Sequence, residues 1–403
     1  MSEAAHIPQL RFPEYSANWS QRLLSDFLIP TLREIEKPKV NYLAIGLRSH
    51  CKGTFQKPDS DPSKIAMEKL FRVKENDLIV NITFAWEGAI AIVKENDEGG
   101  LVSHRFPTYT FDTNITSHHF FKHQFINKRF RYLLDLISPG GAGRNRVMSK
   151  KEFVKLKVPL PSVGEQQKIA AFLTVVDNKI EQLSKKQELL GEYKKGLMQQ
   201  IFSQAIRFQA DDGSTFPDWE EQKVGSFMVE RNKKSPKSEA YPLMSFVARK
   251  GVTEKGERYN REFLVNDEGG KKYKQTEYGD FIYSSNNLET GSIGLNKYGA
   301  ATISPVYSIF QITDTCNYEF VSSFLVTKSF IHKMVRFRQG VVYGQWRIHE
   351  SDFLKIQVKL PSLEEQTKIA NFLSSIDNKI EQVGKQLDES KQFKKALLQQ
   401  MFV

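Results

Sequence analysis

The sequence has very little cysteine and no long apolar run. Cys51 and Cys316 are the only two cysteines in 403 residues and lie far apart in sequence, so neither a disulfide framework nor a cysteine-rich zinc site is indicated. Such sparse use of cysteine suits a reducing cytoplasm. The N-terminus, MSEAAHIPQLRF, lacks a basic region followed by an apolar core, and no run of 18 apolar residues occurs. Secretion and membrane insertion are therefore not expected.

Catalytic signatures are also missing. The sequence contains no Asn-Pro-Pro-Tyr or Asp-Pro-Pro-Tyr motif of an amino-methyltransferase and no convincing cluster of nuclease carboxylates. Asp59, Asp61 and Lys64 fit a solvated turn better. The segment GGAG at residues 140–143 follows an expected helix and has no Lys-Ser/Thr pair, which favours a flexible recognition loop over a nucleotide cradle. No cofactor is expected in this chain.

Three histidines form a candidate metal site. His119 and His123 are four residues apart, and on a helix this spacing would place two imidazoles on one face beside His118. No Glu follows His119 as it does in HExxH, and no third ligand is evident. A metal site is therefore not predicted.

Charge is unevenly distributed along the chain. The formal net charge is +11 and the sequence pI is about 9.3, which favours a polyanionic partner without identifying it. Residues 1–158 hold 24 Lys and Arg against 17 Asp and Glu, whereas residues 204–358 hold 21 against 19. The excess positive charge thus lies on the first block.

One stretch of 45 residues occurs twice, with an offset of 200 residues and no gap. The copies occupy residues 158–202 and 358–402, and 24 of the 45 positions are identical. Each copy begins like a helix, because Ser162 and Ser362 stand three residues before Glu165 and Glu365, which is the spacing of a capping box.

Apolar residues in both copies recur at alternating steps of four and three, the pattern of a coiled-coil seam. The polar exceptions include Lys194 and Lys394. The seam positions are Ile169, Leu173, Val176, Ile180, Leu183, Leu190, Leu197 and Ile201 in the first copy, and Ile369, Leu373, Ile376, Ile380, Val383, Leu387, Leu397 and Met401 in the second.

A helix of about 40 residues is roughly 60 Å long, too long to be buried in one small domain. A single copy of this stripe would fit the core-facing helix of a bundle equally well, but two copies are natural partners. We therefore predict that the helices pair antiparallel within one chain. Such pairing would place the preceding globular blocks at opposite ends, about an approximate two-fold axis, as suits a rod-like partner such as duplex DNA.

The two blocks before the helices have similar layouts of mixed α/β type. Strand-like runs at residues 40–47, 77–84, 89–93 and 108–111 precede an expected helix over residues 117–136 and a loop over 138–147. The second block has runs at residues 241–248, 280–283, 292–295 and 301–312, a helix over 318–336 and a loop over 338–348. The expected segments are thus a globular block at 1–158, a helix at 159–203, a globular block at 204–358 and a helix at 359–403.

Basic and amide side chains in both blocks are candidates for contacting DNA. Arg and Lys neutralise phosphates, while Arg bidentate to guanine, or Asn and Gln bidentate to adenine, identifies bases. Any one of them is more often an ordinary surface residue, and the loops after the two helices are the favoured places. The candidates are Arg48, Lys52, Arg105, Lys128, Arg144, Asn145 and Arg146 in the first block, and Arg249, Lys250, Asn286, Asn287, Tyr343, Gln345, Trp346 and Arg347 in the second.

The motif LPSxxEQxKIAxFL followed by DNKIEQ occurs at residues 160–182 and again at 360–382. It looks like the paired conserved helices of one family, and the whole chain resembles that family, the specificity subunit of bacterial type I restriction-modification enzymes. The blocks look like its two target-recognition domains, and DFIYSSNN at 280–287 with GSIG at 291–294 resembles a segment common in such domains. The first block carries the different DLIVNITFAWEGAI at 77–90.

The resemblance implies a non-catalytic subunit that reads an asymmetric, bipartite DNA site. It also implies two adenine methyltransferase subunits that use S-adenosylmethionine, and restriction subunits that use ATP and Mg for translocation and cleavage. Two other functions stay open: a standalone DNA methyltransferase or nuclease, and a coiled-coil scaffold that binds DNA without reading its sequence.

Overall fold

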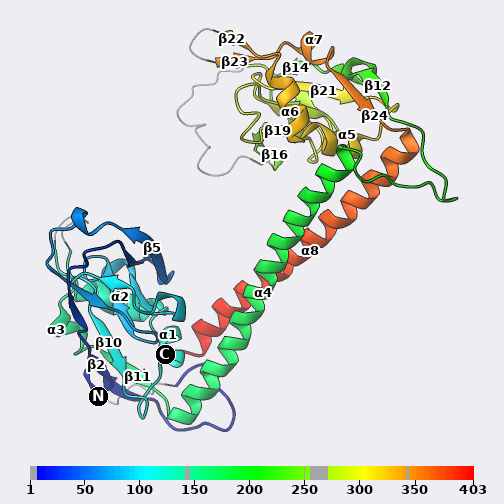
Figure 1. The fold of residues 1–403 in the computed structure, drawn as a ribbon. Coiled ribbons are helices and arrows are strands. Elements are labelled where there is room, and N and C mark those ends of the chain that lie inside the picture. Colours follow the sequence, from blue (N-terminus) through cyan, green and yellow to red (C-terminus); the bar gives the residue numbers. More distant parts are fainter. Residues whose placement is uncertain (1–6, 141–145, 249, 255–270, 342–344) are drawn as a thin grey trace. The chain divides into compact units, whose positions relative to one another are not determined.

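The computed structural model describes residues 7–140, 146–248, 250–254, 271–341 and 345–403. The chain divides into two compact units. Unit 1 comprises residues 1–184 and 384–403, and unit 2 comprises residues 185–383. Each unit therefore contains one globular block together with half of each long helix (Figure 1).

Unit 1 is built from two main sheets. An antiparallel sheet has the order β2-β10-β7-β8, and a five-stranded sheet has the order β3-β6-β9-β4-β5. β1 pairs with β11 and so ties the start of the block to its end. The strands are β1 Ser20–Leu23, β2 Leu28–Pro30, β3 Glu34–Glu36, β4 Tyr42–Leu47, β5 Thr54–Ser60, β6 Lys69–Arg72, β7 Leu78–Val80, β8 Ile90–Ile92, β9 Leu101–Val102, β10 Thr108–Phe111 and β11 Lys157–Leu160. The short helices are η1 Leu24–Asp26, η2 Pro62–Lys64, η3 Ala85–Glu87, η4 Glu95–Asp97, α1 His118–Gln124, α2 Lys128–Leu136 and α3 Lys150–Phe153.

Unit 2 repeats this plan. The sheet β13-β21-β18-β19 corresponds to β2-β10-β7-β8, and β12 pairs with β24 as β1 does with β11. Its strands are β12 Glu220–Lys223, β13 Met228–Glu230, β14 Lys234–Ser235, β15 Ser245–Val247, β16 Gly251–Thr253, β17 Tyr273–Thr276, β18 Phe281–Tyr283, β19 Ile293–Leu295, β20 Ala301–Ile303, β21 Ser308–Ile312, β22 Gln339–Val341, β23 Gln345–Arg347 and β24 Gln357–Leu360. Its short helices are η5 Val224–Ser226, α5 Tyr318–Leu325, α6 Lys328–Val335 and α7 Glu350–Phe353. The mixed α/β class predicted from the sequence is confirmed.

The single helix expected before each recognition loop is in fact two. In unit 1 the side chain of Asn127 accepts a hydrogen bond from the backbone N–H of Arg129 and starts α2 after α1 has ended. In unit 2 the hydroxyl of Thr327 does the same for Phe330 at the start of α6. Asn and Thr are common N-cap residues. A second N-cap within a stretch that has the apolar spacing of one helix ends the first helix and starts another.

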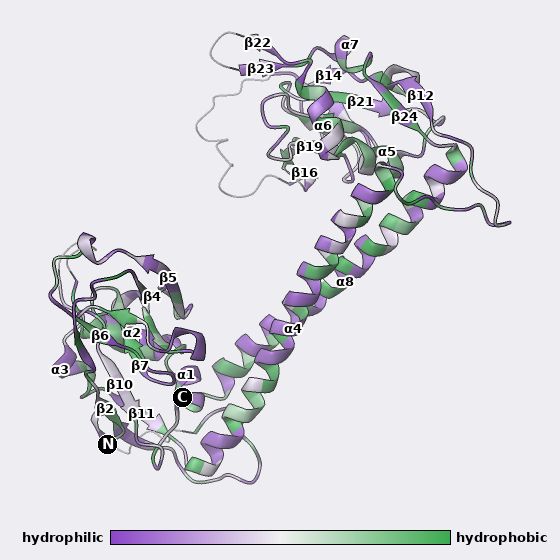
Figure 2. Ribbon diagram, in the orientation of Figure 1, coloured by the Kyte–Doolittle hydropathy of each residue, from purple (hydrophilic) through white to green (hydrophobic). Residues whose placement is uncertain are grey.

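The two repeats form the long helices α4, Val163–Phe202, and α8, Leu363–Gln400. Polar and apolar residues alternate along both ribbons (Figure 2), as a seam requires. Twelve predicted seam residues are buried: Ile169, Leu173, Val176, Leu183, Ile201, Ile369, Leu373, Ile376, Val383, Leu387, Leu397 and Met401. Ile180, Leu190, Leu197 and Ile380 are partly buried.

The helices are antiparallel within each unit. In unit 1 the early part of α4, at Ile169 and Leu173, shares a core with Leu397 near the end of α8 and with Met401, which directly follows that helix. In unit 2 Ile201 from the end of α4 shares a core with Ile369 and other residues early in α8. The same cores contain Trp19 in unit 1 and Trp219 in unit 2, so the helix ends also pack into the globular blocks. The predicted antiparallel pairing is therefore confirmed within each unit.

The two lysines that interrupt the seam pattern form ion pairs between the helices. Lys194 Nζ lies 2.6 Å from Asp377 in unit 2, and Lys394 Nζ lies 2.5 Å from Asp177 in unit 1. Each pair is the counterpart of the other in the 200-residue repeat. The ammonium group ends at the rim of the seam while its alkyl stem covers apolar surface.

The predicted capping box forms only in part. Ser162 Oγ accepts from the N–H of Glu165, and Ser362 Oγ from that of Glu365, both at 3.4 Å. The Glu165 carboxylate is instead bound by the Arg11 guanidinium through two hydrogen bonds of 2.7 Å. Glu365 is bound in the same way by Arg207. These carboxylates anchor the segment that leads into each block, because a bidentate arginine pair outcompetes the return bond to the cap.

His123 in α1 is a buried base without a partner. It is 1% exposed, and neither ring nitrogen has a hydrogen-bond partner among the described residues. Burial lowers its pKa to about 3, and the positive charges of Lys122 and Lys394 and the neighbouring His119 add to this effect. Among the described residues no three His, Cys, Asp or Glu side chains are placed to hold a metal ion.

The low pKa of His123 predicts loss of stability in acid. Below pH about 6.5 this histidine binds a proton in the unfolded chain, whereas in the folded chain it stays neutral until about pH 3. The free energy of unfolding should therefore fall from pH 6.5 toward pH 3, and this one group should lower it by about 2 kcal/mol at pH 5. Urea unfolding between pH 5 and 7.5 measures this. Burial also lowers the pKa of His118, to about 4, and this histidine adds to the slope. His123→Leu should therefore make the slope shallower without removing it, whereas His104→Leu, at an exposed position, should leave it unchanged. Equal slopes for all three proteins would contradict the assignment.

Candidate nucleic-acid interface

The centre of the candidate site in unit 1 is the turn between β7 and β8. Asn81 N–H donates to the carbonyl of Ala89 across its base, and η3 forms its tip. Gly88 closes η3 with φ of 79°, in the left-handed region that favours glycine. A Cβ at Gly88 would lie 3.3 Å from Cys51 Sγ, so glycine also allows a second loop to approach closely.

That second loop is the connection between β4 and β5. His50 and Cys51 donate their N–H groups to the carbonyls of Glu87 and Gly88, both at 2.8 Å. Ser49 Oγ donates to the Glu87 carboxylate at 2.6 Å. His50 and Cys51 have φ of 62° and 54°, a strained conformation for residues with a side chain, which these bonds hold in place. Burial raises the pKa of the Cys51 thiol to about 11, so it stays protonated.

With the β4–β5 connection held against the central turn, the basic residues on either side of this connection are exposed. Arg48 and Lys52 are both exposed, and the Arg48 guanidinium lies 5.5 Å from the centre of the Phe55 ring. Arg105 is also exposed and donates to Thr83 Oγ1 in the central turn at 3.2 Å. Lys128 is exposed at the start of α2, the helix that packs against η3.

Arg146, also a predicted DNA-contacting residue, makes several contacts within the protein. Its guanidinium lies 5.0 Å from the centre of the Trp86 ring, forms a 2.6 Å ion pair with Asp135 and donates to the carbonyls of Asp135 and Ser138. Arg146 therefore joins the end of α2, at Asp135 and Ser138, to Trp86 of the central turn, with its donors largely used within the protein. Arg144 and Asn145 lie outside the described residues.

Unit 2 has the same central turn between β18 and β19. Residues 77–93 and 280–296 correspond without a gap: Ser284 N–H donates to the Ser292 carbonyl as Asn81 does to Ala89, and Gly291 replaces Gly88. The side chains on this common frame differ, because the turn reads NITFAWEGA in unit 1 and SSNNLETGS in unit 2.

The hairpin β22–β23 is fastened to this turn at three points. Asn286 Oδ1 accepts from the N–H of Trp346 at 2.6 Å, and Ser285 Oγ accepts from the N–H of Ile348 at 3.0 Å. Arg338 at the hairpin root forms two 2.7 Å bonds to Glu289 of the turn. An arginine thus closes the junction in both units, but from opposite ends of the loop.

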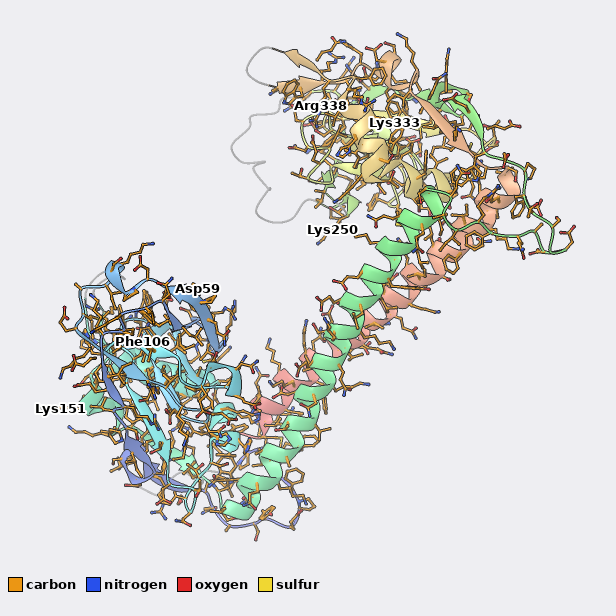
Figure 3. All side chains as sticks on the ribbon, viewed as in Figure 1. Asp59, Phe106, Lys151, Lys250, Lys333 and Arg338 are labelled. Carbon is orange, nitrogen blue, oxygen red and sulfur yellow. The ribbon has the colours of Figure 1, made fainter. Side chains whose placement is uncertain are left out.

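The predicted residues of unit 2 fall into two groups. Asn286 and Asn287 of the turn are exposed, as are Gln345 and Arg347 of the hairpin. Lys250 lies instead at the turn between β15 and β16. This turn packs against β19 near Leu295, at the end of β19 that is farther from the central turn. Figure 3 shows Lys250 apart from Arg338. Arg249 and Tyr343 lie outside the described residues.

Sequence reasoning missed the side chains that hold these surfaces together. Ser49, Glu87 and Trp86 in unit 1, and Ser285, Glu289 and Arg338 in unit 2, were not among the predicted residues. The sequence feature that could have located these surfaces is the match without a gap between residues 77–93 and 280–296, which aligns Gly88 with Gly291. The surrounding contacts join residues 38 to 63 positions apart, which local patterns do not reveal.

Comparison with known proteins places the chain in a family. Residues 28–190 and 217–390 both match the family described as "Type I restriction modification DNA specificity domain". The chain belongs to this family. The two matches cover most of the chain and contain both central turns.

Two curated relatives from Methanocaldococcus jannaschii are named as specificity subunits of type I restriction enzymes. The putative type I restriction enzyme MjaX specificity subunit is 26% identical over 265 residues, which is 62% of this chain and 59% of that protein. The type I restriction enzyme MjaVIII specificity subunit is 26% identical over 269 residues, 62% of each. The matched region thus spans about three fifths of the length of these relatives.

Solved structures support the fold. The type I restriction-modification S subunit from M. genitalium superposes with a TM-score of 0.59 at 15% identity, covering 98% of this chain and 99% of that chain. A chain from a study of complex assembly and conformational transition of the type I R-M system gives a TM-score of 0.52 at 16% identity, covering 94% and 96%. In the part of the chain that the structure describes, no helix is both long and apolar enough to span a membrane.

Proposed function

We propose that this chain is the non-catalytic DNA-reading subunit of a type I restriction-modification complex. The observation that carries the proposal is the pair of central turns, which share one backbone frame and differ in their exposed side chains. Two such surfaces suit an asymmetric site of two half-sites that differ in sequence. Chemistry is left to partner subunits, and the chain acts on DNA in the cytoplasm.

The partners in this proposal are two adenine methyltransferase subunits, which would bring S-adenosylmethionine, and two restriction subunits, which would bring ATP and Mg. The repeat supports two equal docking places. Tyr193 on α4 is 56% exposed, and its counterpart 200 residues later, Phe393 on α8, is 53% exposed. Exposed aromatic side chains at matching positions suit two copies of one partner.

Methyl transfer should require the partners. The purified chain with labelled S-adenosylmethionine and host DNA is expected to transfer no methyl groups, and addition of methyltransferase subunits should start transfer at one bipartite site. Transfer by the chain alone would indicate a standalone methyltransferase and overturn the proposal. DNA binding by the complex without sequence preference, abolished by moderate salt, would indicate a scaffold without readout.

Arg347 should read a base in one half-site. It is 56% exposed, and its ion pair with Glu350, at 3.6 Å, leaves donors free. Arg347→Ala is expected to cost about 1–3 kcal/mol in binding and to relax preference at one position. An equal loss of binding on all duplexes for Arg347→Ala would instead identify a phosphate contact.

Arg146→Ala should act on the protein itself. We expect higher local mobility, measured as faster amide exchange around Trp86.

A further inference from the structure

Trp346 is an exposed aromatic residue on strand β23, which is hydrogen-bonded to the central turn. The residue is 49% exposed. The backbone N–H of Trp346 donates to Asn286, and that of Ile348 donates to Ser285. The Arg338–Glu289 pair holds the start of the hairpin. A large apolar surface held in place in this way is preorganised for a contact outside the chain, because the ordering has already taken place.

The cross-strand neighbour leaves one side of the indole open. In the register of β22 and β23, Gly340 stands opposite Trp346. Directly opposed side chains of an antiparallel pair project to the same face, and glycine has none. A Cβ built on Gly340 would meet no atom within 4 Å, so the space beside it is empty.

The equivalent place in unit 1 is arranged differently. Arg146 stands 200 residues before Trp346, and its guanidinium is stacked on Trp86. At this position unit 1 has an arginine that stacks on its own central turn, whereas unit 2 has an exposed tryptophan. The two units therefore present different chemistry at one position of a shared frame.

We propose that Trp346 is a specificity-determining residue that reads the 5-methyl group of a thymine in the major groove. The inference rests on the proposed function. A two-stranded β-ribbon fits the major groove, and thymine is the base that presents an apolar group there. If the partner methylates adenine, each half-site holding a target adenine also contains the paired thymine. Gln345 and Arg347, the neighbours of Trp346 in β23, are also exposed, and as adjacent strand residues they project to the opposite face of the ribbon from the indole.

The test uses the complete complex with its methyltransferase subunits. Methylome sequencing of a host carrying the system first supplies the recognised duplex. Competition binding then compares this duplex with versions in which each thymine in turn is replaced by deoxyuridine, which pairs identically but lacks the methyl group. The proteins are wild type, Trp346→Ala, Trp346→Phe and Tyr298→Ala. Tyr298 is a matched control, because it is 46% exposed in the same unit but follows the far end of β19.

Wild type should bind about four-fold more weakly when one particular thymine of one half-site is replaced, the effect of burying one methyl group. Trp346→Ala should lose a similar amount on the normal duplex and become insensitive to that replacement, with the other half-site unaffected. Trp346→Phe should keep part of the sensitivity, and Tyr298→Ala should behave as wild type. The backbone bonds of Trp346 do not involve its side chain, so helicity and complex assembly should be retained by Trp346→Ala.

Persistent sensitivity to deoxyuridine in Trp346→Ala would overturn the inference while leaving the proposed function intact. So would a loss of the same size on specific and scrambled duplexes, which would place the indole against the sugar-phosphate backbone. A wild-type complex without preference for the methylome site would remove the proposed function, and this inference with it.

Discussion

Aspartate at both Ile180 and Leu183 should abolish cooperative folding of the helical pair. Leu183 is 4% exposed and Ile180 is packed against the core of unit 1. Each substitution removes apolar contacts and buries a charge without a partner, so together they should cost about 5 kcal/mol or more, comparable to the whole stability of many domains. The expected result is a large loss of helical circular dichroism and a melting transition that is broad or absent.

The control introduces two aspartates on the exposed face of the same helix, α4. Val175 and Leu189 are 67% and 50% exposed, so Val175→Asp with Leu189→Asp should change the free energy of unfolding by less than about 1 kcal/mol. If the seam variant melted like this control, the pairing of α4 with α8 would not be what stabilises the helices.

Lengthening both helices should lengthen the unspecified spacer of the DNA site. α4 runs without interruption from residues of unit 1 into residues of unit 2, and α8 runs back. Four residues inserted after Ser184 and four after Gly384, equivalent places in the repeat, add about 6 Å of helix. Base pairs rise about 3.4 Å, so the spacer should grow by one or two base pairs. Four residues make nearly one helical turn, which keeps the seam on its face with a local stutter.

Methylome sequencing of a host carrying the lengthened chain measures the outcome. Both half-site sequences should survive, because neither central turn is altered. Four residues inserted after Gly213, in an exposed turn of the segment before unit 2's first strand, should leave the spacer unchanged. A changed half-site with the original spacer would show that the helices do not set the separation.

The repeat made the helices predictable from the sequence. Their heptad pattern is local, and a seam of leucine and isoleucine specifies both the helix and the face it buries. The pattern also indicated an antiparallel partner within the chain, since the second copy is present in the same molecule. Lys194 and Lys394 interrupted the pattern, and only the structure shows that each meets an aspartate of the other helix.

The recognition surfaces were predictable only as a set of residue types. Arg48, Arg105 and Arg146 were all candidates because they are basic, yet the structure gives them different tasks. Arg48 is exposed beside a strained loop, whereas Arg146 is committed to Trp86 and Asp135. Whether a guanidinium is free depends on acceptors far away in sequence, and no local pattern encodes them.

The sequence by itself determined the family, the two-fold repeat, the helical seams and the positions of the loops, because these depend on periodicity and on residue types close together in the chain. Tertiary structure alone decided which loops meet. Ser49 reaches Glu87, Asn286 reaches Trp346 and Arg11 takes Glu165 away from its cap. Each of these is a directional bond between atoms brought together by sheet topology, and a hydrogen bond a few ångströms long forms only after the fold has set both ends in place.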